Sequence, residues 1–285
     1  GVNIFSMPEI FEVNRIKNYL LDSGIINNNI RSFEFLNSGQ RILKSHNLLK
    51  ISNFFLNRVL INIIIKAKYT LFIFDKGSML IHYRFTGIFH IDGLSYGDRL
   101  NTIYSLPIKH LNEAYIRFKM IFSNGIILNF FDTRCLSHLH ISDTAQSFSD
   151  YEHISSLADD FLSYEMVPYG VFLNQYYKSN LDLKSFLLDQ TKPPSGIGNY
   201  LANEICAHAK LNPWISIKSL NEYQYNSLVS SMSIILKYAN ESAFYDWFLV
   251  FNRERCGRCD SFIVKKKHKK GAQSTFYCEL CQNSL

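Results

Sequence analysis

The sequence predicts an α+β protein of several domains, in which a helix and a β-sandwich come first, helices follow, and a small metal-binding ribbon ends the chain. Three observations predict this order. Short runs rich in Ile, Phe and Tyr fill the first half, apolar residues at helical spacing fill the second half, and four of the six cysteines form two CxxC pairs near the end. The length of 285 residues and a hydrophobic content of 47% allow two ordinary domains and exclude a disordered or coiled-coil chain.

The first half is expected to hold one helix followed by strands. Apolar residues recur at helical spacing over residues 8–21, which predicts a helix there. Runs dense in β-branched and aromatic side chains predict strands at residues 59–65, 69–74 and 79–83. Residues 76–77 and 124–125 have the composition of hairpin turns. Many short strands with regular turns favour a β-sandwich or barrel, and we place this domain at residues 1–147.

The second half is expected to be helical over residues 148–249. Apolar residues four positions apart form four stripes: Leu157/Phe161, Leu183/Leu187, Leu201/Ile205/Ala209 and Leu228/Met232/Leu236. A loop with the sequence Pro-Pro-Ser-Gly-Ile-Gly joins a helix ending near Gln190 to one beginning near Asn199. Glycines at a helix start let another backbone approach and leave N–H groups free for a phosphate, although the same residues also suit a tight interhelical turn.

The last domain is expected at residues 250–285 and to fold around a metal. Its ligands would be Cys256, Cys259, Cys278 and Cys281. Four thiolates at this spacing can converge on one Zn²⁺ across two short hairpins, and the alternative is four unrelated thiols. Between the two pairs, residues 265–270 read Lys-Lys-Lys-His-Lys-Lys, which predicts contact with nucleic-acid phosphates or, alternatively, a solvated loop.

The charge balance and the hydropathy pattern narrow the class of protein. Thirty Lys and Arg residues against 24 Asp and Glu residues give a formal charge of +6, which hints at an anionic partner. The most apolar window, residues 59–65, is too short for a membrane span, and the first residues lack the features of a secretory signal. We expect a soluble intracellular protein with no membrane partner, and the sequence does not distinguish nucleus, cytoplasm or a viral replication site.

Three motifs resemble, in the same order, the formamidopyrimidine-DNA glycosylase/endonuclease VIII (Fpg/Nei) family. The matching strings are MPEIFEV at 7–13, KSFLLDQ at 184–190, GIGNYLANE at 196–204, VFNR at 250–253 and STFYCELCQ at 274–282. The resemblance implies that the β-sandwich is a catalytic domain, that the helical domain is a helix–two-turn–helix module, and that the tail is a zinc finger with one structural Zn²⁺. It also implies damaged DNA as the partner, and we expect a monomer.

The resemblance assigns chemical roles in the first domain. In the family a proline amine, exposed by removal of the initiator Met, attacks C1′ of a damaged nucleotide, and the matching residue is Pro8. Glu9 matches the acid/base carboxylate, Glu12 a glutamate that supports the site, and Lys68 a lysine at the lesion's phosphate. Without the resemblance, the two glutamates are an acidic first helical turn and Lys68 is an ordinary strand-edge lysine.

The resemblance also assigns contacts with DNA. They are Phe85, Arg134 and Leu136 in two loops of the first domain, Lys184 and Asn199 in the helical domain, Arg253 at the start of the zinc finger, and Gln273 before its third cysteine. The first three match side chains that fill the hole left when a damaged base is extruded. Phe85 and Leu136 suit a hydrophobic core equally well. Lys184 and Asn199 match residues that grip phosphates.

Three departures from the family pattern bear on the chemistry. Six residues precede Met7, and we expect Met7 to be the functional start, because an internal proline has no usable amine. Gln273 stands where the family has an arginine, which predicts a weaker grip on DNA and mainly β-elimination. Residues 238–247 leave little room for the long loop of members specialised for 8-oxoguanine, which favours oxidised pyrimidines or hydantoins.

The function expected from the sequence is that of a base-excision-repair DNA glycosylase with AP lyase activity. An alternative from another class is a catalytically silent, zinc-containing DNA-binding protein on the same scaffold. A zinc-ribbon module that binds RNA or acts in transcription would explain the tail but leaves the other two motifs without explanation.

Overall fold

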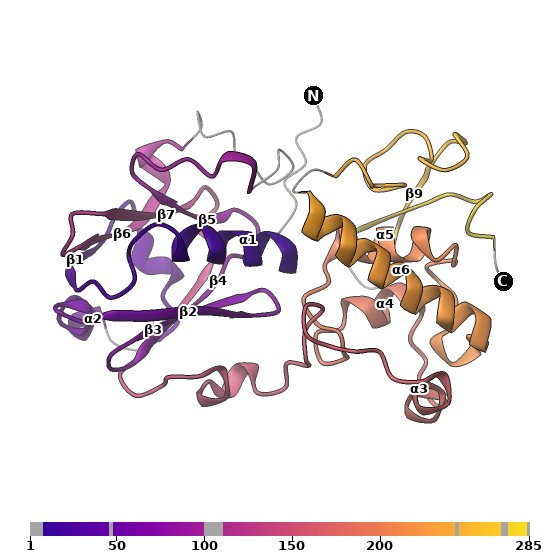
Figure 1. Ribbon diagram of the computed structural model, residues 1–285, viewed down its shortest axis with the longest axis horizontal. Helices are drawn as coiled ribbons and strands as arrows, with labels where there is room; N and C mark the ends of the chain where they lie inside the picture. The colour runs from indigo at the N-terminus through magenta and orange to yellow at the C-terminus, as the bar shows by residue number, and fades with distance from the viewer. Residues whose placement is uncertain (1–7, 46–47, 100–110, 243–244, 269–272, 284–285) are drawn as a thin grey trace. The chain divides into compact units, whose positions relative to one another are not determined.

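The protein is described by a computed structural model covering residues 8–45, 48–99, 111–242, 245–268 and 273–283 (Figure 1). The chain forms two compact units, Gly1–Ser156 and Leu157–Leu285. None of the helices within the described ranges combines the length and the apolar character that crossing a bilayer requires.

Within the described residues, the first unit contains two α-helices and two four-stranded antiparallel sheets. One sheet has the order β1-β6-β7-β5 and the other β2-β3-β4-β8. The helices are α1 (Ile10–Leu21) and α2 (Leu48–Phe55), and the strands are β1 (Ile30–Phe35), β2 (Leu60–Lys66), β3 (Tyr69–Phe74), β4 (Ser78–His82), β5 (Gly87–Ile91), β6 (Ile116–Phe122), β7 (Ile127–Asp132) and β8 (His138–Ser142). The expected helix and β-sandwich are therefore confirmed, as are the three expected strands, whose ends move by one residue at most.

Aromatic side chains fill the space between the sheets. Phe118 stacks on Phe130 with ring centroids 5.1 Å apart, and Phe89 lies 4.8 Å from Phe130. Val13 and Ile16 of α1 are fully buried in the same core, as the helical periodicity predicts. Burying each such side chain contributes about 2 kcal/mol, so the core fixes α1 and with it Glu9, the residue directly before the helix.

In the part of the second unit that the structure describes, four α-helices accompany a two-stranded ribbon. The helices are α3 (Tyr169–Tyr176), α4 (Leu183–Leu188), α5 (Asn199–His208) and α6 (Glu222–Glu241), and the ribbon strands are β9 (Val264–Lys267) and β10 (Ser274–Tyr277). Helix α5 packs against α4, α6 and β10, so it is the central element of the unit. The stripe expected on α6 is corrected at one position, because Ile235 is fully buried while Leu236 is only half-buried.

The helix expected from Leu157 and Phe161 does not form. The backbone of this segment pairs with the loop between α4 and α5: Ala158 N–H donates to Gln190 O at 3.0 Å, and Phe161 N–H donates to Ser195 O at 2.9 Å. These long-range bonds satisfy donors that a helix would use internally, so the four-residue spacing of the two apolar side chains was misleading. Phe161 is nevertheless buried.

Candidate functional site

Two buried carboxylates and a buried amine gather at the start of the first helix. Glu9 and Glu12 are each 1% exposed and Lys68 is 8% exposed. Glu9 precedes α1, and its backbone N–H donates to Glu12 Oε2 at 3.0 Å. Lys68 lies in the two-residue turn between β2 and β3, the strands on which α1 packs. The fold thus brings Lys68 close to Glu9 and Glu12, which lie 59 and 56 residues earlier in the chain.

The electrostatics of this group favour proton transfer. Burial lowers the pKa of the Lys68 ammonium from its usual value, and the nearby carboxylates of Glu9 and Glu12 oppose that shift. Arg84, which follows β4 at a φ of 55°, adds to the lowering. Burial, Lys68 and Arg84 also lower the pKa of His82 to about 3, so its imidazole is neutral near pH 7. An amine with a lowered pKa beside carboxylates can exchange protons with a ligand.

Pro8 is buried next to this group and is the first described residue. Its neighbour Glu9 caps α1, so the position of Pro8 is fixed by the helix start. Met7, the expected functional start, lies outside the described residues.

Two loops at the end of neighbouring strands carry Phe85, Arg134 and Leu136. The Arg134 guanidinium lies 4.6 Å from the centroid of the Phe85 ring, and that of Arg84 lies 5.6 Å from it on the same ring. Leu136 is 40% exposed, so it does not belong to the core. Phe85 is half-buried against the two cations. The three side chains expected to act together in DNA therefore lie on adjoining loops.

The loop before α5 is held by Gln190. Its Oε1 accepts from Gly196 N–H at 2.8 Å, and its Nε2 donates to Ile197 O at 3.0 Å. Gly196 has a φ of 90°, a left-handed conformation that favours glycine. Asn199 begins α5 and is half-buried, with Nδ2 donating to Ser274 O at 3.2 Å.

Lys184 has a different position from the one expected of a residue that grips phosphate. Its side chain is fully buried, and Nζ donates to Ser274 O at 3.1 Å and to Thr275 Oγ1 at 2.9 Å. The expectation that Lys184 contacts DNA directly is corrected by this burial. The ammonium instead fastens strand β10, and with it the adjoining Gln273, to the helices.

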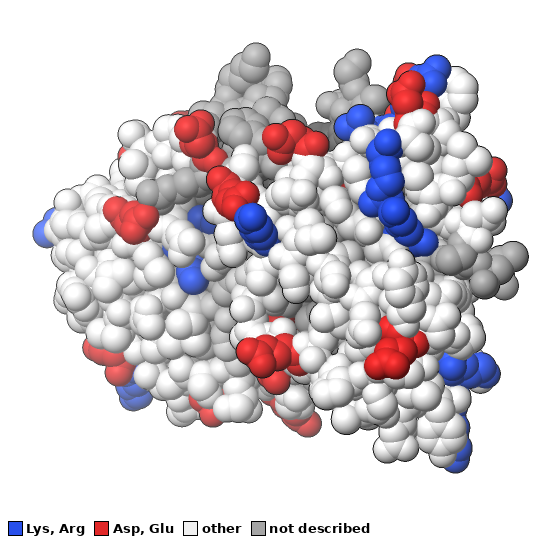
Figure 2. All heavy atoms as spheres, turned by 45° about the vertical axis from the view of Figure 1, so that its right-hand side comes forward, with Lys and Arg blue, Asp and Glu red and all other residues white. Residues whose placement is uncertain are grey.

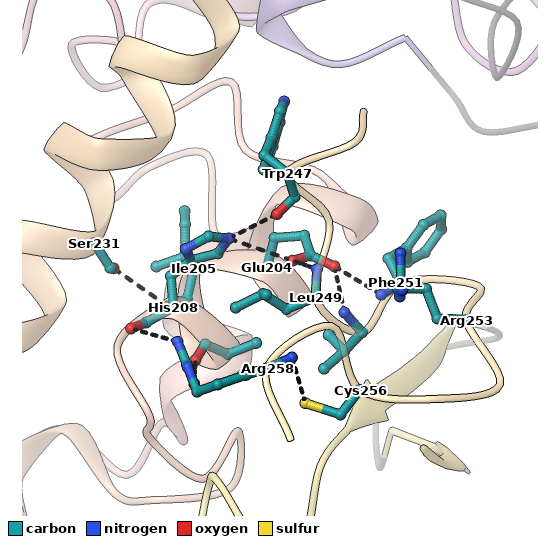
Figure 3. Close-up of polar contacts among 12 residues, drawn as sticks. Glu204, Ile205, His208, Ser231, Trp247, Leu249, Phe251, Arg253, Cys256 and Arg258 are labelled. Carbon is teal, nitrogen blue, oxygen red and sulfur yellow. Dashed lines mark hydrogen bonds and ion pairs between the residues drawn. The ribbon is translucent and has the colours of Figure 1, made fainter. Parts of the chain in front are cut away.

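A further buried carboxylate, that of Glu204 on α5, holds the segment that leads into the ribbon (Figure 3). Its Oε2 accepts from Leu249 N–H at 2.7 Å, and its Oε1 accepts from Val250 N–H at 2.9 Å and from Phe251 N–H at 2.7 Å. Arg258, next to the first cysteine pair, donates to Ala207 O at 3.0 Å. These bonds place Arg253, which is exposed, at a fixed distance from α5.

The four ribbon cysteines converge. Their Sγ atoms all lie within 4.8 Å of one another, with Cys259 and Cys278 3.5 Å apart and Cys256 and Cys281 4.0 Å apart. Among the described residues they form the one group of three or more His, Cys, Asp or Glu side chains that could hold a metal ion.

The basic run at residues 265–270 contains both exposed and buried side chains. Lys265, Lys266 and Lys267 are exposed on β9, whereas His268 is buried, with Nε2 2.9 Å from Asp182 Oδ1. Lys269 and Lys270 lie outside the described residues. On the face drawn in Figure 2, some of the Lys and Arg side chains form a compact row, and the others are scattered among mostly uncharged residues. Gln273 is half-buried beside β10.

Three residues that organise the site escaped the sequence analysis: Asp132, Glu204 and His268. Asp132 and Glu204 are fully buried acids that each accept hydrogen bonds from several backbone N–H groups. An acid at the end of a mostly apolar strand was the available signal for Asp132. His268 was hidden within a run of lysines, where nothing local marks it as buried.

Comparison with known proteins agrees with this arrangement. Residues 7–139 match the family model for the formamidopyrimidine-DNA glycosylase N-terminal domain. The chain is 28% identical to a formamidopyrimidine-DNA glycosylase of Mycoplasma pneumoniae, with 97% of this chain and 99% of the relative covered. It is 29% identical to one of Ureaplasma parvum, with 97% of this chain and all of the relative covered.

Solved structures share the whole fold. Lactococcus lactis Fpg in complex with DNA containing an abasic site superposes with a TM-score of 0.79 at 21% identity, covering 96% of this chain and 99% of that one. A second Lactococcus lactis complex gives a TM-score of 0.80 at 22% identity, covering 97% of this chain and all of that one. The fold is that of Lactococcus lactis Fpg, and the chain carries a cluster of four cysteines that could hold a metal ion. The family-model match, the relatives and the shared fold together support membership of the Fpg/Nei family.

Proposed function

We propose that this protein is a base-excision-repair DNA glycosylase with AP lyase activity and that the amine of Pro8 is its nucleophile. The observation that carries the proposal is the group formed by Glu9, Glu12 and Lys68 beside Pro8. Buried carboxylates and a buried amine next to a nucleophile are suited to moving the protons that base release and elimination require. Relatives named formamidopyrimidine-DNA glycosylase support the reaction class.

The first chemical step replaces the damaged base. The Pro8 nitrogen bonds to deoxyribose C1′ and loses its proton, while the bond from C1′ to the base breaks and its electron pair leaves with the base, which takes up a proton. The C1′–O4′ bond then opens with a proton delivered to O4′, and an iminium remains between C1′ and Pro8. We assign these proton transfers to Glu9, with Glu12 supporting it.

The second step cleaves the strand. The iminium acidifies the C2′ proton, and its loss expels the 3′ phosphate by β-elimination. Lys68 is assigned to the lesion's phosphate, where its positive charge would favour departure of that group. Water then hydrolyses the iminium and restores Pro8. This chemistry requires Pro8 at the amino terminus, because a terminal amine has a pKa of roughly 8 and a peptide nitrogen has no available lone pair.

The partner in this proposal is damaged DNA bound by a monomer. Phe85, Arg134 and Leu136 would fill the space left by the extruded base. Asn199 and Arg253 would contact phosphates, with Gln273 offering neutral hydrogen bonds. Lys184 would act indirectly, through the position of β10.

One structural Zn²⁺ fits the ribbon. Four sulfurs bound to a single zinc at about 2.3 Å in a tetrahedron lie about 3.8 Å from each other. The Sγ separations of 3.5 Å and 4.0 Å are close to this value. Cys256, Cys259, Cys278 and Cys281 would hold the ion, which would join the two ends of a ribbon too small for a core of its own.

The substrate preference we propose is for oxidised pyrimidines or hydantoins, with β-elimination as the main cleavage reaction. Helix α6 ends at Glu241, and Trp247 already packs on Phe248 at the start of the ribbon segment, with ring centroids 4.7 Å apart. This short connection supports a site without a long lesion-covering loop. Gln273 supports a preference for the first elimination, since it adds no charge beside the phosphates.

Borohydride trapping tests the proposal. A chain trimmed to begin at Pro8 should form a covalent adduct with lesion-containing oligonucleotides, and the chain that retains residues 1–7 should not. Glu9→Gln in the trimmed chain should lower base release. Oligonucleotides carrying thymine glycol, a hydantoin or 8-oxoguanine would rank the substrates. DNA binding by the trimmed chain with no adduct on any of them would favour the catalytically silent alternative.

A further inference from the structure

We propose that Asp132 is a positioning residue that locks the loops carrying Phe85, Arg134 and Leu136 into one rigid element. The inference rests on the proposed function, in which these side chains enter the DNA together. In this proposal, the buried carboxylate of Asp132 holds these three side chains in fixed positions before DNA binds.

The two loops leave the same end of one sheet. Strands β5 and β7 are antiparallel neighbours, and Gly87, the first residue of β5, pairs with Asp132, the last residue of β7. The loop at 83–86 therefore ends where the loop at 133–137 begins. Because the strands belong to the buried sandwich, their ends provide a firm base for both loops.

The carboxylate of Asp132 is fully buried and accepts hydrogen bonds from both loops. Oδ2 accepts from Leu136 N–H and from Ser137 N–H, each at 2.8 Å. Oδ1 accepts from Arg134 N–H at 3.1 Å and from the hydroxyl of Thr86 in the other loop. Two of the N–H groups belong to residues proposed to enter DNA, and Thr86 directly follows the third such residue, Phe85.

Further contacts hold the two loops together at their base, which we call the junction, and these contacts need no DNA. Ser137 Oγ donates to Tyr83 O at 2.9 Å, which is a second tie between the loops. The buried Arg117 donates from Nε to Asp132 O at 2.7 Å. A Cβ on Gly87 would lie 2.5 Å from Ser137 Oγ and 2.8 Å from Tyr83 O, so the junction tolerates only glycine there.

The consequence is that Phe85 and Arg134 are presented as a stacked pair, 4.6 Å from guanidinium carbon to ring centroid. Side chains that must enter a duplex at the moment a base leaves lose less freedom on binding when they are already held in place. A small displacement of such groups lowers the rate of a positioned reaction by as much as about 100-fold. The rigid junction therefore matters for extruding a base from a duplex and not for the chemistry at the sugar.

The test compares two substrates in protein trimmed to begin at Pro8. The first is a lesion-containing duplex with 2-aminopurine beside the lesion, assayed by stopped-flow fluorescence and single-turnover base release. The second is a single-stranded abasic-site oligonucleotide, assayed by borohydride trapping, in which no base leaves a duplex. Thr86→Val removes the hydroxyl that donates to Asp132 and accepts from Arg134 N–H at 3.2 Å, and it keeps the backbone bonds to Asp132 and the bond from Ser137 to Tyr83. Asp132→Asn weakens both the bond to Thr86 and the backbone bonds. Asp150→Asn is the control, because Asp150 also accepts backbone N–H groups, from Gln146 and Ser147, but away from these loops.

We expect Thr86→Val and Asp132→Asn to slow base extrusion and release in the duplex about 10-fold or more, with trapping on the single strand within about 3-fold of wild type. Asp150→Asn should alter neither. Equal losses on both substrates, or an unchanged duplex rate in Thr86→Val, would overturn the inference. Failure of the unsubstituted protein to trap the abasic oligonucleotide would instead count against the proposed function. If Asp132→Asn does not fold, Thr86→Val alone decides.

Discussion

Glu204 Oε2 accepts a 2.7 Å hydrogen bond from the backbone N–H of Leu249, which lies 45 residues further along the chain. The other carboxylate oxygen accepts from the next two backbone N–H groups (Figure 3). One side chain of the central helix thus satisfies three successive donors of the segment that leads to the cysteine ribbon. Burial raises the pKa of Glu204 to about 7, and the three N–H groups oppose that rise.

Glu204→Ala is expected to destabilise the second unit by about 3 kcal/mol or more, because it leaves buried N–H groups without acceptors. Glu204→Gln should destabilise the unit less than Glu204→Ala, because the amide oxygen of Gln can still accept hydrogen bonds. Some destabilisation should remain, because the NH₂ group of Gln would face a backbone donor. Urea unfolding measures both free energies. Glu165→Gln, at an exposed acid of the same unit, is the control. Equal midpoints for Glu204→Ala and the control would contradict this role for Glu204.

His82 is expected to make the first unit less stable in acid. Its pKa is about 3 in the folded protein and about 6.5 when unfolded, so below pH 6.5 the unfolded chain binds a proton that the folded chain does not. Stability is therefore lost as the pH falls, by about 2 kcal/mol between pH 6.5 and pH 5. Urea unfolding of wild type and His82→Gln at both pH values measures this. Parallel losses in the two proteins would show that His82 is not the cause.

Local patterns in the sequence were sufficient for much of the fold. Helical spacing gave α1, runs of β-branched residues gave β2 to β4, and paired CxxC motifs gave the ribbon, because in each case the signal and the structure occupy the same few residues. Leu157 and Phe161 show where this fails. Their spacing suits a helix, but their backbone is bound by residues more than 30 positions away.

The candidate site was predictable only as a list of residues. Glu9 and Glu12 adjoin in sequence, but their closeness to Lys68 depends on how α1 packs on β2 and β3. The surroundings of His268 are also long-range, since its partner Asp182 is 86 residues away. A lysine at 184 was expected at the surface, and its burial follows from acceptors on β10 that no local pattern reveals.

Removal of zinc is expected to loosen the ribbon and leave the β-sandwich intact. Cys278→Ser should lower the metal content from about one zinc per chain to near zero, because the remaining thiolates hold the ion poorly. DNA affinity should fall about 10-fold or more, with unchanged thermal unfolding of the first unit. Metal analysis and DNA titration measure the two effects. Cys135→Ser, at a cysteine outside the ribbon, should retain the metal, and loss of zinc there would contradict the assignment.

Lys184→Met is expected to release strand β10 without unfolding the helices. The substitution removes the donor to Ser274 O and Thr275 Oγ1 and should destabilise the docked ribbon by about 2 kcal/mol. Hydrogen exchange at Ser274–Tyr277 should become faster, while exchange in α5 stays slow. Lys192→Met is the control, since Lys192 forms a partly exposed ion pair with Asp189 at 3.9 Å. Unchanged protection of β10 would show that Lys184 does not fasten it.

Gln273→Arg is expected to strengthen DNA binding and to shift the cleavage products. An added guanidinium beside β10 would contact one more phosphate, so the slope of log affinity against log salt should steepen by about 1, with affinity about 3-fold to 10-fold higher near 0.1 M salt. The added charge should also favour the second elimination and raise the share of 3′-phosphate product on a denaturing gel. Gln175→Arg, at an exposed position on α3, adds the same net charge elsewhere. If both variants gain affinity equally, general attraction to DNA rather than a contact at residue 273 explains the change. A clean β,δ product from the unsubstituted protein would refute the assignment of Gln273 as the cause of limited elimination.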